Sequence, residues 1–279
     1  MQWNQWLSWA TSQLKNSDTP KRDAEILLEQ VLKKSRAQLL AFGETLLEHN
    51  NIIQLNHLIT RRKNREPIAY IIGYKEFWSL NFKVSRGTFI PRPDTECLIQ
   101  HTLDLFNNTV NLNVLDLGTG IGTIALSIAS EQPTWNITGI DCQNQALKLA
   151  EKNKASFNLK NVKFLHGNWF QKLMKKKFNL IISNPPYISK NDPCLKNSDL
   201  IFEPPRALIS QKSGLSDLTI ISKYSTQHLC HNGWLIMEHG WNQGEYIRTL
   251  LKKIKFTNIC TIRDHNHQER ITCGKWIIY

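Results

Sequence analysis

The chain has 279 residues, of which 41% are hydrophobic, and its formal net charge at pH 7 is +12. The length accommodates two average domains, and the hydrophobic fraction is ordinary for a globular protein. No apolar run approaches the ~18 residues that a membrane-spanning helix needs. The first residues also lack the basic and then apolar pattern of a signal peptide, so we expect a cytoplasmic protein.

The positive charge favours a polyanionic partner, or one bound to RNA, through long-range attraction. The alternative is an ordinary solvated surface, because lysines are scattered and the basic clusters at 61–63 and 175–177 are short. The six cysteines include no C-x-x-C pair, and none lies at metal-ligand spacing with a histidine. This pattern predicts reduced, mostly buried thiols and no metal site.

Residues 1–73 are predicted to form a helical domain. Trp3, Trp6 and Ala10 lie at three- and four-residue spacing, and later apolar residues repeat this amphipathic pattern. Pro20 fits the first position of a second helix. We expect the tryptophans to belong to the core rather than to a binding surface.

Residues 74–88 are expected to form a linker with a small β-hairpin, because alternating apolar residues are interrupted near Ser79. The proline-containing segment Ile90–Glu96 then leads into a helix that starts around Thr95. The second domain is predicted to cover residues 89–279.

Strands and helices alternate beyond residue 111. The predicted strands are 114–116, 137–141, 162–165, 178–182, 234–238, 259–263 and 276–279. The predicted helices are 123–130, 145–153 and 216–230. This alternation predicts an α/β, Rossmann-like domain with a mainly parallel sheet and helices on both faces.

A glycine loop connects the first strand of this domain to the next helix. It consists of Gly118, Thr119, Gly120, Ile121 and Gly122. Glycine permits positive φ and close backbone approach, and a helix N-terminus supplies free N–H groups. The G-x-G-x-G spacing differs from the G-x-G-x-x-G of dinucleotide sites, which favours a different nucleoside cofactor.

Polar residues after successive strands complete the expected cofactor site. Asp141 ends the second strand, where a carboxylate can accept both ribose hydroxyls or cap the next helix. Asp116 could orient the cationic end of S-adenosylmethionine, or it could simply accept N–H bonds from the loop. Asn168 is expected to meet the adenine amino group, and Trp169 either covers the base or belongs to the core.

A proline-stiffened corner, Asn184-Pro185-Pro186-Tyr187, directly follows a buried apolar strand. The side-chain oxygen of Asn184 and the carbonyl of Pro185 can each accept one N–H of a planar NH2 group. This aims the nitrogen lone pair and stabilises positive charge growing on the nitrogen. Tyr187 can stack on the group. The corner therefore predicts methyl transfer to an amide or amino nitrogen, and the alternative is a structural Pro-Pro turn.

Together these motifs resemble those of the bacterial release factor glutamine methyltransferases. The matching segments are Glu76–Trp78, Ile90–Glu96, Asp116–Gly120, Asn184–Tyr187, Phe202–Pro204 and Glu238–Gly240. The resemblance runs from about residue 20 to the C-terminus. It implies S-adenosylmethionine-dependent N5-methylation of the glutamine in the Gly-Gly-Gln tripeptide of peptide chain release factors. It also implies a seven-stranded methyltransferase domain and an N-terminal helical domain that grips the factor.

Carried over by position, the resemblance implies that the glycine loop, Asp141, Trp169 and Asn184 contact the cofactor or bridge to the substrate. It further implies that the corner holds the glutamine amide. Arg92 and Glu96 are expected to line the same cavity, unless they form only an ion pair at the start of the helix. Weaker candidates for that cavity are Glu203 and Glu238.

The chain departs from the family pattern at two positions. Asn168 stands where an acidic residue is common, so we expect weaker cofactor binding rather than its loss. Ile201 stands where a basic residue is common, which puts one substrate-facing or structural contact in doubt. The expected partner is a release factor. We expect the protein to be a monomer that binds no metal, does not associate with a membrane and makes no direct contact with nucleic acid.

Two other functions fit parts of the pattern. A DNA adenine N6-methyltransferase also needs a corner of this type together with base flipping. However, we find no target-recognition segment after Tyr187 and no clear groove-reading motif in the N-terminal helices. A non-catalytic RNA- or ribosome-binding protein would be indicated by loss of a loop glycine, Asp141 or Asn184, and all of these are present.

Overall fold

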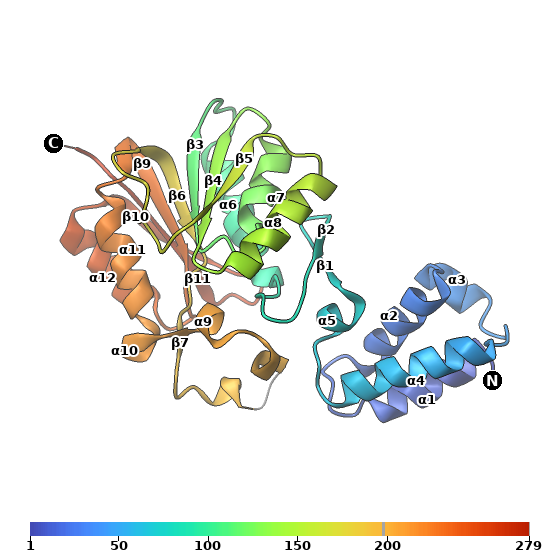
Figure 1. Ribbon diagram of the computed structural model, residues 1–279. Coiled ribbons are helices and arrows are strands. Elements are labelled where there is room, and N and C mark those ends of the chain that lie inside the picture. The colour runs from blue at the N-terminus through green and yellow to red at the C-terminus, as the bar shows by residue number, and fades with distance from the viewer. Residues whose placement is uncertain (197–198, 279) are drawn as a thin grey trace. The chain divides into compact units, whose positions relative to one another are not determined.

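The computed structural model describes residues 1–196 and 199–278, and Figure 1 labels its elements. The chain divides into two compact units. The first unit is Met1–Tyr74 with Lys196–Phe202, and the second is Lys75–Leu195 with Glu203–Tyr279. The boundaries expected from the sequence, with 74–88 as a linker, stay a prediction.

The first unit is helical. Its helices are α1 (Trp3–Gln13), α2 (Pro20–Leu32), α3 (Arg36–Ala41), α4 (His49–Lys63) and α5 (Ile68–Ile72). Trp3 and Trp6 are buried in the core of this unit, which confirms their predicted role, while Trp9 is more exposed. Pro20 is the first residue of α2, also as predicted, because its missing N–H costs nothing there.

A buried arginine joins three segments of the first unit. Arg62 of α4 pairs with Asp23 of α2 at 2.6 Å and with Asp199 at 2.8 Å. A buried cation needs such partners, because an unpaired charge away from water is strongly destabilising. The contact with Asp199 shows how Lys196–Phe202, far along the chain, becomes part of this unit.

The second unit is built on a seven-stranded sheet in the order β10-β11-β9-β6-β3-β4-β5. The strands are β3 (Asn113–Leu117), β4 (Asn136–Asp141), β5 (Val162–His166), β6 (Phe178–Ser183), β9 (Leu229–Glu238), β10 (Thr257–Arg263) and β11 (Glu269–Lys275). Only β11 runs antiparallel to its neighbours, β9 and β10. The mainly parallel α/β sheet predicted from the sequence is therefore confirmed.

Helices cover both faces of this sheet, with α6, α7 and α8 on one side and α11 and α12 on the other (Figure 1). These helices are α6 (Glu96–Leu105), α7 (Thr123–Glu131), α8 (Asn144–Ser156), α11 (Ser216–Ser225) and α12 (Gly244–Ile254). Leu115, Leu117 and Leu235 are fully buried in the core. Strands covered on both faces show such continuous apolar runs.

Shorter elements frame the sheet. They are β1 (Tyr74–Phe77), β2 (Leu80–Lys83), the 3-10 turn Pro93–Thr95, β7 (Ile188–Ser189), the 3-10 turns Pro193–Leu195 and Asp199–Phe202, α9 (Pro205–Leu208), β8 (Ile209–Ser210) and α10 (Gln211–Gly214). The hairpin of β1 and β2 has its break at Trp78-Ser79, as predicted, and both residues have positive φ. The predicted start of a helix near Thr95 is also confirmed.

Two predicted elements were wrong at their ends. The helix expected over 216–230 ends at Ser225, because Leu229 is buried in β9 and pairs with Phe178 of β6. The strand expected over 276–279 lies earlier, at 269–275, since β11 fills the place between β9 and β10. Its polar residues concealed a strand whose central residues, 271–274, are all buried, and Tyr279 lies outside the described residues.

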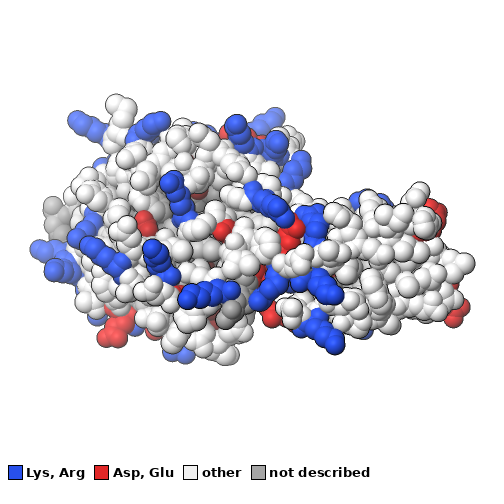
Figure 2. Space-filling model, turned by 60° about the horizontal axis from the view of Figure 1, so that its bottom comes forward, with Lys and Arg blue, Asp and Glu red and all other residues white. Residues whose placement is uncertain are grey.

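Basic side chains are dispersed over the face shown in Figure 2, with fewer acidic side chains among them. The use of the positive charge for binding therefore stays a prediction. Within residues 1–196 and 199–278, no helix combines the length and the apolar character that spanning a membrane would require.

Candidate active site

A cavity of about 340 Å³ lies in the second unit and is lined by residues that follow strands β3, β4, β5 and β6. Its volume is within the range of small-molecule sites. Ligands of open α/β sheets bind at this carboxyl edge, where the connections diverge from the central strand. The predicted site residues that line it are Gly118, Thr119, Gly120, Ile121, Asp141, Asn168, Trp169, Asn184 and Pro186.

The glycine loop is held by its own backbone against β4. The N–H groups of Gly118 and Thr119 both donate to the carbonyl of Ile140, at 2.8 and 2.9 Å. Gly118, Gly120 and Gly122 all have positive φ, which only glycine adopts without strain. A Cβ on Gly122 would also stand 2.8 Å from a methyl group of Leu126. Gly122 therefore shapes the loop by packing and does not line the cavity.

Asp141 links the loop to the next helix. Its carboxylate accepts from the N–H of Gly120 at 2.8 Å and from the N–H of Gln143 at 2.7 Å. Burial raises the pKa of this carboxyl group, while these N–H donors lower it. Each carboxylate oxygen has two lone pairs, so capping contacts leave capacity for ribose hydroxyls. Both readings of Asp141 are compatible with its place in the cavity wall.

Asp116 lies behind the loop, fully buried and outside the lining of the cavity. One carboxylate oxygen accepts from the Thr119 hydroxyl at 2.6 Å and from the Ala125 N–H at 3.2 Å. Within the described residues, the other oxygen has no hydrogen-bond partner. Burial raises the pKa of Asp116 to about 7. A cation bound nearby would compensate this carboxylate, which fits the ammonium group of S-adenosylmethionine.

The expected adenine end of the cavity is formed after β5. Trp169 lines the cavity and also packs against the core of the sheet, so the two alternatives for this residue coexist. Its ring is 3.3 Å from where a Cβ on Gly118 would stand, a second reason for glycine at that position. Asn168 is exposed and lines the cavity beside it.

Contacts at both ends hold the backbone of the Asn184–Tyr187 corner. The hydroxyl of Ser183 donates to the carbonyl of Leu117 at 2.7 Å. At the other end, the Gln243 side chain donates to the carbonyl of Tyr187 at 3.0 Å. A Cβ on Gly214 would lie 2.1 Å from that carbonyl oxygen, so glycine is required there. The backbone of the corner is therefore anchored at both ends by contacts of the fold itself.

Asn184 and Tyr187 of the corner are hydrogen-bonded to a buried pair, Thr95 and Glu238. The Asn184 NH2 group donates to the Thr95 hydroxyl at 3.1 Å, and Thr95 donates to Glu238 at 2.7 Å. The Tyr187 hydroxyl donates to the other oxygen of Glu238 at 3.1 Å. Burial raises the pKa of Glu238 to about 7, and it raises the pKa of Tyr187 as well.

Two residues of the corner, Pro185 and Tyr187, are not part of the cavity lining, although their neighbours Asn184 and Pro186 are. Thr95, which sequence reasoning did not single out, lines the cavity beside Asn184. Its signal was its place in the Pro-Asp-Thr-Glu run, directly before α6.

Among the described residues that line the cavity, neither Arg92 nor Glu96 appears. The carboxylate of Glu96 accepts from the Trp78 N–H at 3.0 Å and so supports the β1–β2 turn. Arg92 pairs with the buried Glu203, which also accepts from the Ile90 N–H. These contacts take the place of the ion pair that was the alternative for Arg92 and Glu96, and a substrate role for either residue stays a prediction.

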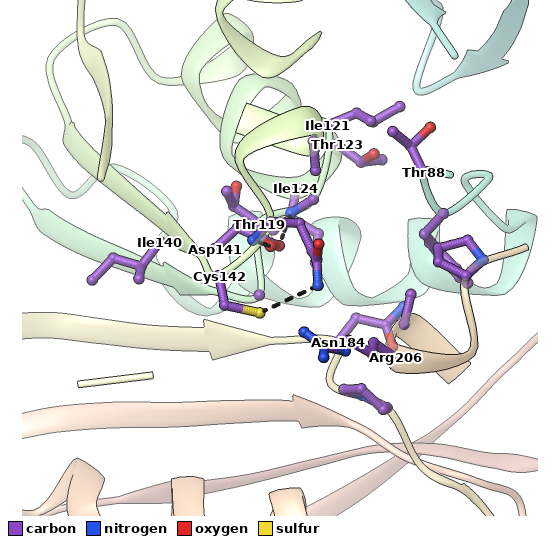
Figure 3. Close-up of a pocket in the computed structure, with 18 of the residues that line it drawn as sticks. Thr88, Thr119, Ile121, Thr123, Ile124, Ile140, Asp141, Cys142, Asn184 and Arg206 are labelled. Atoms are coloured by element: carbon purple, nitrogen blue, oxygen red, sulfur yellow. Dashed lines mark hydrogen bonds between the residues drawn. The ribbon is translucent and has the colours of Figure 1, made fainter. Parts of the chain in front are cut away.

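Further lining residues were not anticipated from the sequence. Figure 3 shows Asn184 and Arg206 lying together across the cavity from Asp141 and Cys142. Arg206 comes from the short helix α9, and Cys142 directly follows Asp141. Nothing in the local pattern marked Arg206, because its connection to the cavity depends on chain folding over long distances. Cys142 could have been found from its place directly after Asp141 at the end of β4.

A cluster of His101, Cys260 and Cys273 lies outside the cavity lining. Their ligand atoms all lie within 4.8 Å of one another. The sequence showed no metal-ligand spacing between a cysteine and a histidine, and the expectation that the protein holds no metal stays a prediction. Sequence spacing could not show this cluster, because Cys260 and Cys273 face each other across β10 and β11.

Comparison with known proteins identifies the class of protein to which this fold and this site belong. The family model described as the PrmC N-terminal domain matches residues 5–73, and the methyltransferase small domain matches residues 93–215. The crystal structure of a methyltransferase from Pyrococcus furiosus has a similar fold, with a TM-score of 0.56 and 16% identity, covering 80% of this chain and 98% of that chain. Fold and site thus define a class I methyltransferase with S-adenosylmethionine as methyl donor.

Full-length relatives narrow this class. A release factor glutamine methyltransferase from Salmonella typhimurium is 45% identical over 276 residues, which cover 99% of each chain. One from Escherichia coli is 44% identical over the same length and coverage. The chain belongs to the release factor glutamine methyltransferase family.

Proposed function

We propose that this chain methylates N5 of the glutamine in the Gly-Gly-Gln tripeptide of peptide chain release factors, using S-adenosylmethionine. The observation that carries the proposal is the position of Asn184. Its side chain lines the cavity shared with the glycine loop, and its NH2 group is directed away to Thr95. The amide oxygen is thus left to accept a hydrogen bond from a substrate.

The residues present fit the cofactor in three ways. The cavity has a suitable volume, and Asp141 presents a carboxylate to it. Behind the loop, one oxygen of Asp116 has no hydrogen-bond partner in the part of the chain that the structure describes. In this proposal the glycine loop and Asp141 hold the nucleoside, and Asn168 and Trp169 meet its base. When bound, S-adenosylmethionine supplies an electrophilic methyl carbon on a sulfonium.

The corner then has to make a poor nucleophile react. An amide nitrogen has its lone pair delocalised into the carbonyl group, so alignment is essential. The oxygen of Asn184 accepts one N–H of the glutamine amide, and the carbonyl of Pro185 accepts the other. These acceptors stabilise the nitrogen as the new C–N bond makes it cationic. The N-methylated amide then loses a proton to water, so no carboxylate base is required.

Selectivity for the release factor is assigned to the helical first unit in this proposal. The match of residues 5–73 to the PrmC N-terminal domain supports this assignment. The proposal also includes a monomeric, metal-free enzyme that makes no direct contact with nucleic acid. A cytoplasmic location belongs to it as well, because the substrate is a protein of translation.

Mass spectrometry of a release factor after incubation with this chain and S-adenosylmethionine tests the proposal. The expected result is a single methyl group on the glutamine of the tripeptide. A release factor with that glutamine replaced by alanine is the matched control and should stay unmodified. Methyl transfer from tritiated cofactor to DNA, with none to the release factor, would favour the adenine N6 alternative and contradict this proposal.

A further inference from the structure

We infer that Thr95 and Glu238 are positioning residues that orient the Asn184 side-chain amide, so that its oxygen rather than its NH2 group faces the substrate. The inference rests on the proposed function, because it concerns how that site holds the amide of its substrate. Neither residue is assigned contact with the reacting atoms.

The direction of the hydrogen bonds follows from counting hydrogens. The Thr95 hydroxyl has one hydrogen and donates it to Glu238 at 2.7 Å. Towards Asn184 the Thr95 oxygen can then only accept, and the Asn184 NH2 group donates to it at 3.1 Å. If the amide were reversed, two oxygens would face each other without a hydrogen between them. The ionised carboxylate of Glu238 therefore dictates the orientation of Asn184, although the two side chains share no hydrogen bond.

The chain is built into the fold. Thr95 is 3% exposed and Glu238 is 1% exposed, so bulk water does not compete for these bonds. Ser183 of β6 lies opposite Met237 of β9, and this register brings the next residues, Asn184 and Glu238, to the same edge of the sheet. The Thr95 N–H donates to the carbonyl of Arg92 at 3.1 Å, which fixes the hydroxyl at the start of α6.

Protonation of Glu238 would reverse the direction of these hydrogen bonds. A protonated carboxyl group can donate to Thr95, which frees the Thr95 hydroxyl to donate to the oxygen of Asn184. The Asn184 NH2 group would then face the NH2 group of the substrate, and donors would oppose donors. Burial opposes the ionised form of Glu238, and so does the negative charge of Asp94. The ionised form is favoured by the hydrogen bonds from Thr95 and Tyr187 and by the positive charge of Arg270. Because the pKa of Glu238 is about 7, this change in protonation occurs within the pH range in which the enzyme is assayed.

The test compares Thr95→Val, which keeps the shape but removes the hydroxyl, with Thr95→Ser, which keeps the hydroxyl. At pH 8 with saturating cofactor and release factor, we expect kcat of T95V to fall by about 10-fold or more. Misalignment of Asn184 would raise the activation free energy, and each ~1.4 kcal/mol of that energy lowers the rate tenfold. The serine variant should stay within about 3-fold of wild type. Cofactor affinity, measured by calorimetry, should be similar in all three proteins, since Thr95 makes no contact that holds the glycine loop.

The pH dependence supplies a readout that a purely structural role would not move. Wild-type kcat should fall as pH drops from 8 to 6. Glu238→Gln cannot ionise, and its amide NH2 group can donate to Thr95 as the protonated carboxyl group would. It should therefore have a lower rate at pH 8 and no such fall. Glu131→Gln is the matched control, because Glu131 accepts from the indole of Trp78 and lies outside the cavity lining. Its profile should match the wild type.

A T95V enzyme with wild-type kcat, or an E238Q enzyme that keeps the fall below pH 7, would overturn the inference. If T95V does not fold, as judged by its thermal transition, the E238Q profile alone decides. Failure of the proposed function looks different, because the wild-type enzyme itself would then leave the release factor unmethylated.

Discussion

The two halves of the site are held in different ways. The glycine loop is fixed mainly by main-chain bonds, such as those from Gly118 and Thr119 to the carbonyl of Ile140. The acceptor corner is fixed by side chains from distant elements, among them Thr95 and Gln243. The contrast indicates that the cofactor half tolerates changes far from its motif, whereas the acceptor half depends on residues that lie far from the corner in the chain.

The largest effect is expected at the centre of the corner. Asn184→Ala should lower the rate of release factor methylation by at least ~100-fold, the scale of losing a preorganised hydrogen-bonding group. Cofactor should still bind, because the loop and Asp141 remain. Single-turnover methylation and calorimetry with S-adenosylmethionine separate the two quantities. Near-normal turnover in this variant would contradict the role proposed for Asn184.

A pair of glycine variants tests whether the halves fail independently. Gly214→Ala places a methyl group against the carbonyl of Tyr187, so the corner must move and kcat should fall ~10-fold or more at unchanged cofactor affinity. Gly122→Ala instead crowds Leu126 under the loop, so it should weaken cofactor binding first. Both glycines have positive φ, so alanine introduces a comparable backbone strain at each position and the two variants form a matched pair. The same pattern of defects in both variants would argue against two separately held halves.

Asp116→Asn should separate stability from function. The folded-state pKa of Asp116, about 7, lies above its ordinary value, so its stabilising contribution is complete at low pH and is lost as pH rises through 7. Asparagine stays neutral, and the variant without cofactor should therefore have a Tm about 5 °C higher than wild type at pH 8. At pH 4, close to the ordinary pKa of 3.8, the two should differ little. Differential scanning calorimetry at both pH values measures this.

The same variant should bind S-adenosylmethionine more weakly, by ~10-fold, because the charge that complements the cofactor ammonium is gone. Such a trade between stability and affinity is typical of buried groups at functional sites. A variant with unchanged Tm at pH 8 and unchanged affinity would show that the unpartnered oxygen of Asp116 has no electrostatic role.

The smallest effect is expected at the adenine end. Asn168→Asp restores the acidic residue that is common in the family and should strengthen cofactor binding by a few-fold, since a charged acceptor makes the stronger hydrogen bond. Equilibrium binding of S-adenosylmethionine tests this, and Asn168→Ser is a control without a carboxylate. Weaker binding by the aspartate variant would indicate that Asn168 does not meet the adenine amino group.

Most of the fold could be predicted from the sequence. Alternating strands and helices indicated the mainly parallel sheet, and Trp3 and Trp6 of α1 were recognised as core residues. The failures lie where pairing in space overrides local pattern, as in β9, which begins at Leu229, and in the polar strand β11. The glycine loop, Asp141 and Asn184 were recognised as candidates because each follows directly from a strand.

Short-range sequence patterns are enough to specify the positive-φ loop, the stiff corner and the mainly parallel sheet that presents them. The side chains that support the corner are known only from the folded chain. Thr95 and Glu238 are 143 residues apart in the chain, and their hydrogen bond depends on the register of β6 and β9. Backbone preferences depend on a few neighbouring residues and can be read from the local sequence. A buried hydrogen bond can join two groups that are far apart in the chain, and only the folded structure shows that they meet.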